Sequence, residues 1–271
     1  MDKNGLEKII KRELEIFDEI VRICKKHDIH YVLGGGSCLG AVRHQGMIPW
    51  DDDIDLSMYR ADYERFLEVC KTELNENYYV QNMDNEENYA LVFGKVRDHN
   101  SYFSEKYCKN VKMKKGIWVD IFPYDNVCEN EDNRIKEYKK LKRLNSFLTI
   151  KCGYVYGGMK GIMKLQYWIV RFITLFIPKK VLKKKIKHLM FKYNNIETDF
   201  IFPFGGAYGA KEKITKEFFF DTIEVEFEGR KANIFKGYDT YLTTLYGDYM
   251  TPPPQKDREY GHGIIEYEIY K

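Results

Sequence analysis

The sequence predicts a mixed α/β fold, with a sheet in the first half of the chain and an inserted group of helices after it. Helix and strand patterns alternate from residue 1 to 125, which is typical of such a fold. The pattern then stays helical over 130–195, and 200–271 returns to strand and turn patterns. No repeat or low-complexity linker separates these parts. We therefore expect one domain made of a core (1–125), a helical insertion or cap (130–195) and a C-terminal segment (200–271) that completes the fold.

In the core, the spacing of apolar residues defines each element. Apolar residues recur every three or four positions over 5–27 and again over 61–74, which predicts two amphipathic helices. A brief helix is expected at 39–43. Short apolar or alternating runs predict strands. These strands are expected at 29–33, 53–58, 78–82, 89–96 and 117–122.

Two further patterns describe the rest of the chain. The helical pattern of the insertion is interrupted by Gly157-Gly158 and by Pro178, residue types that end helices. Farther on, 223–227 and 231–235 alternate as the two strands of a hairpin would.

Composition and charge describe a folded protein without a nucleic-acid partner. Of the 271 residues, 44% are hydrophobic and 31% are charged, so the chain can bury a core. A formal net charge of +3 gives no electrostatic basis for binding nucleic acid. The cysteines form no Cys-x-x-Cys pair, and charges throughout 1–24 exclude the apolar stretch of a signal peptide. We therefore expect a cytoplasmic protein with reduced thiols.

Four aspartates fall within five residues, at positions 51, 52, 53 and 55. So many negative charges repel one another unless a cation or a basic ligand binds them. Successive side chains of a strand alternate between faces, so Asp51, Asp53 and Asp55 would share one face. Asp53 and Asp55 are the pair best placed to bind Mg²⁺ (or Mn²⁺), with Asp51 as a further ligand. Asp52 would face the other way and be a solvated or turn residue.

A third carboxylate is offered by Asp120, which stands between Val119 and Ile121 in a predicted strand. A buried acid is costly unless it is paired with a charge or a metal. If this strand neighbours 53–58, Asp120 completes a three-carboxylate site for Mg²⁺. The alternative is that Asp120 caps a turn before Pro123, and the spacing alone does not decide between the two.

The turn Gly34-Gly35-Gly36-Ser37 lies where a predicted strand leads into a helix. Backbone amides at the start of a helix bind phosphate readily, so Gly36 and Ser37 are candidate substrate-binding residues.

Four basic side chains are further candidates for binding a phosphorylated substrate. Arg43 and His44 follow the glycine turn, and simple surface exposure is the alternative reading for both. Lys95 and Arg97 would share one face at the end of a predicted strand, where they could clamp a diphosphate. Strand-edge charge that deters aggregation is the alternative for this pair.

Competing interpretations of the acids can be tested on the sequence. An EF-hand loop starting at Asp51 would need Gly and Glu where the chain has Leu56 and Asp62, so that class is excluded. A haloacid-dehalogenase nucleophile should end a buried hydrophobic strand, whereas Pro49 and Trp50 precede the acids. A glycosyltransferase that binds a metal through Asp53-Ile54-Asp55 remains open.

At this point the residues resemble a known family. The run 40–55, Gly-Ala-Val-Arg-His-Gln-Gly-Met-Ile-Pro-Trp-Asp-Asp-Asp-Ile-Asp, is similar to the signature of the LicD/fukutin phosphotransferases. Residues 119–123, 246–250 and the prolines 252–254 also look like blocks of that family. The resemblance implies a nucleotidyltransferase-like fold, related to the DNA polymerase beta palm.

The resemblance also implies an activity and a site. Members transfer a phosphorylated group from a CDP-activated donor to a sugar hydroxyl, typically phosphocholine from CDP-choline to teichoic acid, lipopolysaccharide or a capsule precursor. The family pattern is a Gly-Ser turn, an acid pair and a third acid on a neighbouring strand, and Gly36-Ser37, Asp53/Asp55 and Asp120 fill those places. Our hypothesis is that Asp53 and Asp55 hold Mg²⁺ bridging the diphosphate, and that Asp120 completes the site and accepts the hydroxyl proton. The extra glycines before Ser37 depart from the usual pattern and leave open which amides would donate.

Several functional alternatives remain beside phosphocholine transfer. The transferred group could be glycerol phosphate, ribitol phosphate or a sugar phosphate. A metal-dependent glycosyltransferase is a second class, and a glycan-binding protein with a degenerate site is a third. Choline would need a cage of aromatic side chains, and the sequence does not single out its members. His262 could be a catalytic base, but a lone histidine near the end of the sequence is expected to be solvated.

The stretch 164–192 has two readings. Its apolar residues and the lysines beyond Pro178 could dock at the inner face of the cell membrane, next to a lipid-linked glycan acceptor. The other reading, which we favour from the sequence, is a helix packed on the catalytic domain with a solvated basic end. The run 165–177 contains Arg171 and is too short to span a bilayer.

Overall fold

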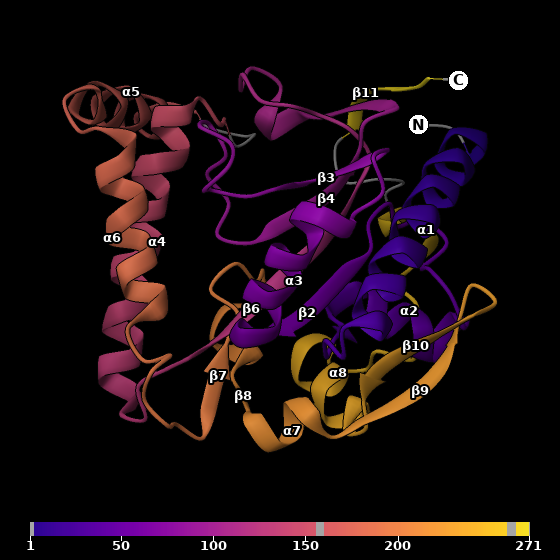
Figure 1. The fold of residues 1–271 in the computed structure, drawn as a ribbon. Coiled ribbons are helices and arrows are strands. Elements are labelled where there is room, and N and C mark those ends of the chain that lie inside the picture. The colour runs from indigo at the N-terminus through magenta and orange to yellow at the C-terminus, as the bar shows by residue number, and fades with distance from the viewer. Residues whose placement is uncertain (1–2, 156–159, 259–263, 271) are drawn as a thin grey trace.

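A mixed sheet lies at the centre of the molecule (Figure 1). The computed structural model describes residues 3–155, 160–258 and 264–270. Strands β2 and β6 are parallel neighbours, and the other pairs in this sheet are antiparallel. The predicted mixed α/β class is confirmed. The strand order is β1 (Val32–Leu33), β2 (Asp55–Tyr59), β6 (Trp118–Asn126), β4 (Gly94–Asp98) and β3 (Tyr78–Gln81), with β7 (Phe200–Phe202) pairing β6 and β8 (Ile214–Thr215) pairing β7.

Helices and a hairpin pack around this sheet. Helices α1 (Lys3–Lys26) and α3 (Arg60–Glu73) contact each other and strand β6. Helix α2 (Gly35–His44) contacts α8 (Tyr238–Tyr246) and the hairpin of β9 (Thr222–Phe227) and β10 (Arg230–Phe235). A short helix, α7 (Lys216–Phe220), precedes the hairpin. Elements of the C-terminal segment 200–271 therefore pack against α2, which belongs to the first 125 residues.

Three helices stand at one side of the body: α4 (Glu131–Cys152), α5 (Ile162–Leu175) and α6 (Lys179–Phe191) (Figure 1). Helices α4 and α6 lie side by side, and α5 lies at one end of the pair. Leu148 of α4 and Ile186 of α6 are fully buried in a second hydrophobic cluster, separate from the one around the sheet. This second cluster also contains residues of the predicted core, among them Met83, Tyr89 and Val111, and the division of the chain into three parts stays a prediction.

The structure corrects several predicted boundaries. Strand β4 covers Gly94–Asp98, whereas the sequence predicted 89–96. Two paired strands, β5 (Ser101–Glu105) and β11 (Ile264–Ile269), were not predicted, although 265–269 alternate between apolar and acidic residues. They pair across most of the chain. The predicted break at Gly157-Gly158 and the residue His262 lie outside the described residues. Within the described part, none of the helices is both long and apolar enough to cross a bilayer.

Candidate active site

Three carboxylates from two distant parts of the chain meet at the centre of the sheet. Asp55 of β2 stands opposite Asp120 of β6 in the parallel pair. Their neighbours Leu56 and Ile121 are buried in the core, so the two acids share the other face. Carboxylate oxygens of Asp53, Asp55 and Asp120 all lie within 4.8 Å of one another. Of the two readings of Asp120, the structure supports the one that places it beside Asp55.

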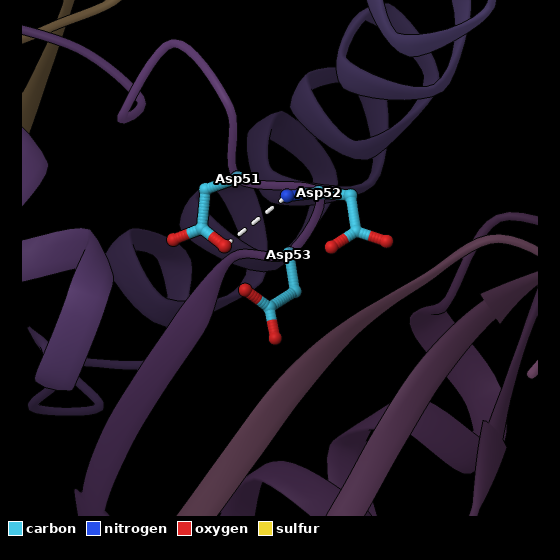
Figure 2. A group of neighbouring side chains, drawn as sticks. All are labelled: Asp51, Asp52 and Asp53. Atoms are coloured by element: carbon cyan, nitrogen blue, oxygen red, sulfur yellow. Dashed lines mark hydrogen bonds between the residues drawn. The ribbon is translucent and has the colours of Figure 1, made fainter. Parts of the chain in front are cut away.

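The acids just before β2 form a second, overlapping group. Carboxylate oxygens of Asp51, Asp52 and Asp53 also lie within 4.8 Å of one another, and Figure 2 shows the three carboxyl groups gathered around this short segment. The amide of Asp52 donates to Asp51 Oδ1 at 3.3 Å. The prediction that Asp52 is solvated is wrong, because its exposure is 2%. Residues 51–54 are not a strand, so strict alternation does not apply to them.

One carboxyl group that sequence analysis missed lies beside these acids. Glu13 of α1 is 1% exposed, and its Oε2 has no hydrogen-bond partner among the described residues. Burial, and then the charges of Asp53, Asp52, Asp51 and Asp120, raise the pKa of Glu13 well above its usual range. Ile9 and Phe17, four positions before and after it, are buried. A charged residue inside the buried stripe of a helix was the available signal.

A buried lysine, Lys95, forms an ion pair with Asp120, the third acid of the site. Lys95 of β4 lies opposite Asp120 and donates to its Oδ1 at 2.5 Å. The lysine is 2% exposed, and its Nζ lies 4.0 Å from the centre of the Trp118 ring. Burial raises the pKa of the Asp120 carboxyl, and the neighbouring Lys95 charge opposes that shift. The predicted candidate Lys95 is thus placed among the acids.

Arg97, the other predicted clamp residue, is bound to the protein itself. Its exposure is 1%. Its Nε donates to Gln81 Oε1 at 2.6 Å, and a second guanidinium nitrogen donates to the Gly116 carbonyl at 2.6 Å. These bonds connect β3, β4 and the segment before β6. Direct binding of a diphosphate by Arg97 stays a prediction.

The start of α2 lies directly against the acids. The amide of Asp55 donates to Ser37 Oγ at 2.8 Å, which fixes the helix to β2. A Cβ atom added to Gly35 would lie 3.3 Å from Asp55 Oδ2, and one added to Gly36 would lie 3.0 Å from Asp51 Oδ2. Gly35 also has a φ of +45°, a left-handed conformation that side chains disfavour. Glycine therefore allows the helix N-terminus and the carboxylates to approach each other.

The predicted candidates Arg43 and His44 lie at the other end of α2, next to Trp50. Arg43 donates to the Tyr249 carbonyl at 2.6 Å and to His44 Nε2 at 3.0 Å. Its guanidinium lies 5.9 Å from the centre of the Trp50 ring, and that of Arg258 lies 4.6 Å from it. Burial and then the charges of Arg43 and Arg258 lower the pKa of His44. Sequence analysis missed Arg258, because only the fold brings it next to Trp50, the residue before Asp51.

A small pocket lined by aromatic residues opens beside Asp55. We call it the aromatic pocket. The buried Glu212 lies in its wall and accepts a hydrogen bond from the Tyr208 amide at 2.9 Å. Burial raises the pKa of Glu212 to about 7. The sequence shows the glycines at 205 and 206 but gives no sign that they bring Glu212 to the acids. The aromatic and acidic residues that line the aromatic pocket are Phe122, Tyr124, Tyr208, Tyr241, Asp55 and Glu212.

Part of the chain matches the model of a known family. Residues 28–149 match the family model described as "LicD/FKTN/FKRP, nucleotidyltransferase domain". This segment contains the start of α2 and all four aspartates of the cluster, as well as Asp120.

Two relatives show how far the similarity extends. The chain is 33% identical over 259 residues to the lipopolysaccharide cholinephosphotransferase LicD of Haemophilus influenzae, covering 92% of each chain. It is 46% identical over 43 residues to the human ribitol 5-phosphate transferase FKRP, which is 16% of this chain and 9% of that relative. The first similarity covers nearly the whole molecule, and the second is confined to a short block.

Proposed function

Because this chain belongs to the LicD family and is therefore a transferase, we propose that it transfers phosphocholine from CDP-choline to a hydroxyl of a cell-surface glycan. The observation that carries the proposal is the meeting of Asp53, Asp55 and Asp120 at the N-terminus of α2. The near full-length similarity to a lipopolysaccharide cholinephosphotransferase supports choline as the group and lipopolysaccharide or a similar glycan as the acceptor. The parallel strands that carry Asp55 and Asp120 support a nucleotidyltransferase-like fold.

The donor set suits a divalent cation. Three carboxylates within 4.8 Å of one another offer the oxygen ligands that Mg²⁺ or Mn²⁺ prefers. Asp53, Asp55 and Asp120 would hold the ion, with Asp51 next to them. When bound, the ion would neutralise charge on the donor's diphosphate and on the leaving CMP.

The remaining steps fall to the protein's own groups. The amides of Gly36 and Ser37 would bind a donor phosphate oxygen, because those of Gly35 and Cys38 already donate to Tyr241 Oη and the Gly34 carbonyl. Asp120 would accept the proton of the attacking hydroxyl, and its raised pKa suits that role. Lys95 would hold the Asp120 carboxylate in position. Arg97 would position β4 through its bonds to Gln81 and Gly116, in addition to any contact with the diphosphate.

The aromatic pocket is the proposed site of the choline group. A quaternary ammonium is recognised by aromatic faces, and three tyrosines and one phenylalanine line this pocket. A carboxylate in the wall adds charge attraction once it ionises. The pocket also contacts Asp55, so an ammonium bound there would lie within reach of the phosphate site.

A donor panel tests the proposed function. We expect CMP release with Mg²⁺ from CDP-choline but much less from CDP-glycerol or CDP-ribitol, measured by chromatography with a lipopolysaccharide acceptor. If CDP-ribitol is preferred, the protein is still a phosphotransferase, but the donor that we propose is wrong. Preference for a UDP- or GDP-sugar would reject the proposal in favour of a glycosyltransferase.

Glu212 predicts how donor binding depends on pH. Its pKa of about 7 means that the carboxyl is neutral below pH 7 and charged above it. We expect the KM for CDP-choline to fall severalfold as pH rises from about 6 to 8, because the ionised form attracts the ammonium. The variant Glu212→Gln should lose this dependence. The KM for CDP-glycerol, which carries no ammonium, provides the control, and an equal pH trend for both donors would contradict the assignment.

The same pKa shift has a consequence for stability. The folded state favours the protonated form of Glu212, because the folded pKa of about 7 lies above the usual 4.5. Its stabilising contribution is therefore complete below about pH 4.5 and is lost as pH rises through 7. Urea unfolding of the protein and of Glu212→Gln at pH 5 and pH 8 measures the difference.

A further inference from the structure

Helix α5 carries a row of large apolar side chains that the described part of the protein does not cover. Leu165, Trp168, Phe172 and Phe176 are 59%, 56%, 63% and 76% exposed. Their spacing of three and four residues places them on one face of the helix. Figure 1 shows α5 at the end of the α4–α6 pair, away from the sheet. So large an exposed apolar stripe marks an interaction surface.

The opposite face of α5 is firmly attached, so the exposure is a property of the fold. Lys151 of α4 donates to the Thr174 carbonyl at 2.5 Å, and Arg171 donates to the Ile150 carbonyl at 3.1 Å. Both bonds join α5 to the last turn of α4. Tyr167 faces the cavity between α5 and α4, while its neighbour Trp168 lies exposed.

The chemistry of the partner follows from the charges around α5. The 59 residues from 138 to 196 contain 15 Lys and Arg but no Asp or Glu. On α6, Lys179, Lys183 and Lys187 bind acceptors in the loop 83–88. The lysines that remain exposed around α5 are Lys160 and Lys164 before and on it, and Lys180, Lys184 and Lys185 on α6.

We propose that the outer face of α5 docks on an anionic lipid leaflet. The apolar row would enter the boundary between headgroups and acyl chains, and the exposed lysines would contact anionic headgroups. A second copy of this chain fits less well, because its α5 would bring an equally basic segment into contact. The sequence favoured a helix packed on the catalytic domain with a solvated basic end. That description fits α6, whose Leu182, Ile186 and Leu189 are buried, but it does not fit the exposed apolar face of α5.

Vesicle flotation tests the docking surface. We expect the full-length protein to float with phosphatidylglycerol-containing vesicles at about 0.1 M salt, less at high salt, and weakly with phosphatidylcholine alone. The double variant Trp168→Ser, Phe172→Ser should reduce binding at least about tenfold. The triple variant Lys180→Gln, Lys184→Gln, Lys185→Gln should reduce binding to the anionic vesicles by roughly 100-fold.

Matched variants serve as controls. Ile196→Ser with Met250→Ser removes two residues of similar exposure, 55% and 54%, outside α5. Lys8→Gln, Lys11→Gln and Lys25→Gln remove the same charge from the exposed side of α1. Both controls should float like the unaltered protein. Equal losses in the controls and the α5 variants would overturn the proposal.

Two further measurements separate this proposal from others. Trp168 fluorescence should shift to the blue on adding anionic vesicles, and Trp168→Phe should remove the shift. Light scattering in the absence of lipid tests for dimers. If the protein forms dimers that Phe172→Ser dissociates, and if it does not float with vesicles, the face would instead bind a second copy of the chain. CMP release with a short soluble acceptor should be unchanged in the α5 variants, so docking and the proposed transfer can fail independently.

Discussion

Replacing Asp55 with asparagine is expected to lower kcat/KM for transfer by on the order of 10³-fold or more, because this carboxylate stands at the centre of the site. Its oxygens lie within 4.8 Å of both Asp53 and Asp120 oxygens. Its amide also donates to Ser37, and asparagine keeps that backbone bond. The loss should therefore be confined to metal and phosphate binding. CMP release with CDP-choline measures it.

Folding and metal controls make this result specific. The melting temperature of Asp55→Asn should equal or exceed that of the unaltered protein, because one of several like charges is removed. Asp221→Asn, at an acid that is 56% exposed on its side chain, should keep full activity. EDTA should abolish CMP release, and Mg²⁺ or Mn²⁺ should restore it. Near-normal transfer by Asp55→Asn would refute the assignment of the site.

The second large effect is on stability. Arg60→Ala should cost about 3–5 kcal/mol of unfolding free energy, because it leaves a buried carboxylate unpaired. Two guanidinium nitrogens of Arg60 donate to the two oxygens of Asp125 at 2.7 and 2.8 Å. Asp125 is 0% exposed. Burial raises the pKa of Asp125 and Arg60 opposes that shift, so the variant should recover part of its stability at low pH.

The chain contains a matched control for this pair. Arg230 makes the same two-nitrogen contact with Asp18 at 2.6 and 2.9 Å. There the side chains are 31% and 51% exposed. Arg230→Ala should therefore cost less than about 1 kcal/mol. Urea unfolding of both variants tests the prediction, and equal losses would show that burial does not determine the cost.

Sequence patterns identified the parts of the site but not how they meet. An acid between two apolar residues marked Asp120, and its pairing with Asp55 agrees with that reading. The two acids are 65 positions apart, and no periodicity states that β6 lies beside β2. The strand order is set by how the helices pack on the sheet. The spacing of residues does not predict that these two strands are neighbours, whereas the resemblance to a family does.

Residues missed by the sequence were those whose role depends on burial. The position of Glu13 within the buried stripe of α1 was a signal, but only the fold shows that it lies beside the aspartates. Asp52 was misplaced because alternation was extended into residues that form no strand. Glu212 reaches the site through a glycine-rich segment, and the packing of that segment has no local pattern. Tertiary contacts determine the environment of each of these residues.

Strand β6 connects the candidate active site with the group of three helices. Asp120 lies near the start of β6, and Asp125 and Asn126 lie near its end. Asn194, just beyond α6, binds both of the latter residues: its side-chain nitrogen donates to Asp125 at 2.6 Å, and its side-chain oxygen accepts from the Asn126 amide at 2.8 Å. Helix α4 has 22 residues and so extends about 33 Å from this junction toward α5. If α5 rests on a leaflet, this rigid framework holds the carboxylates at a set height above the lipid. The enzyme would then act as a ruler, modifying hydroxyls only at a certain distance along a lipid-linked glycan.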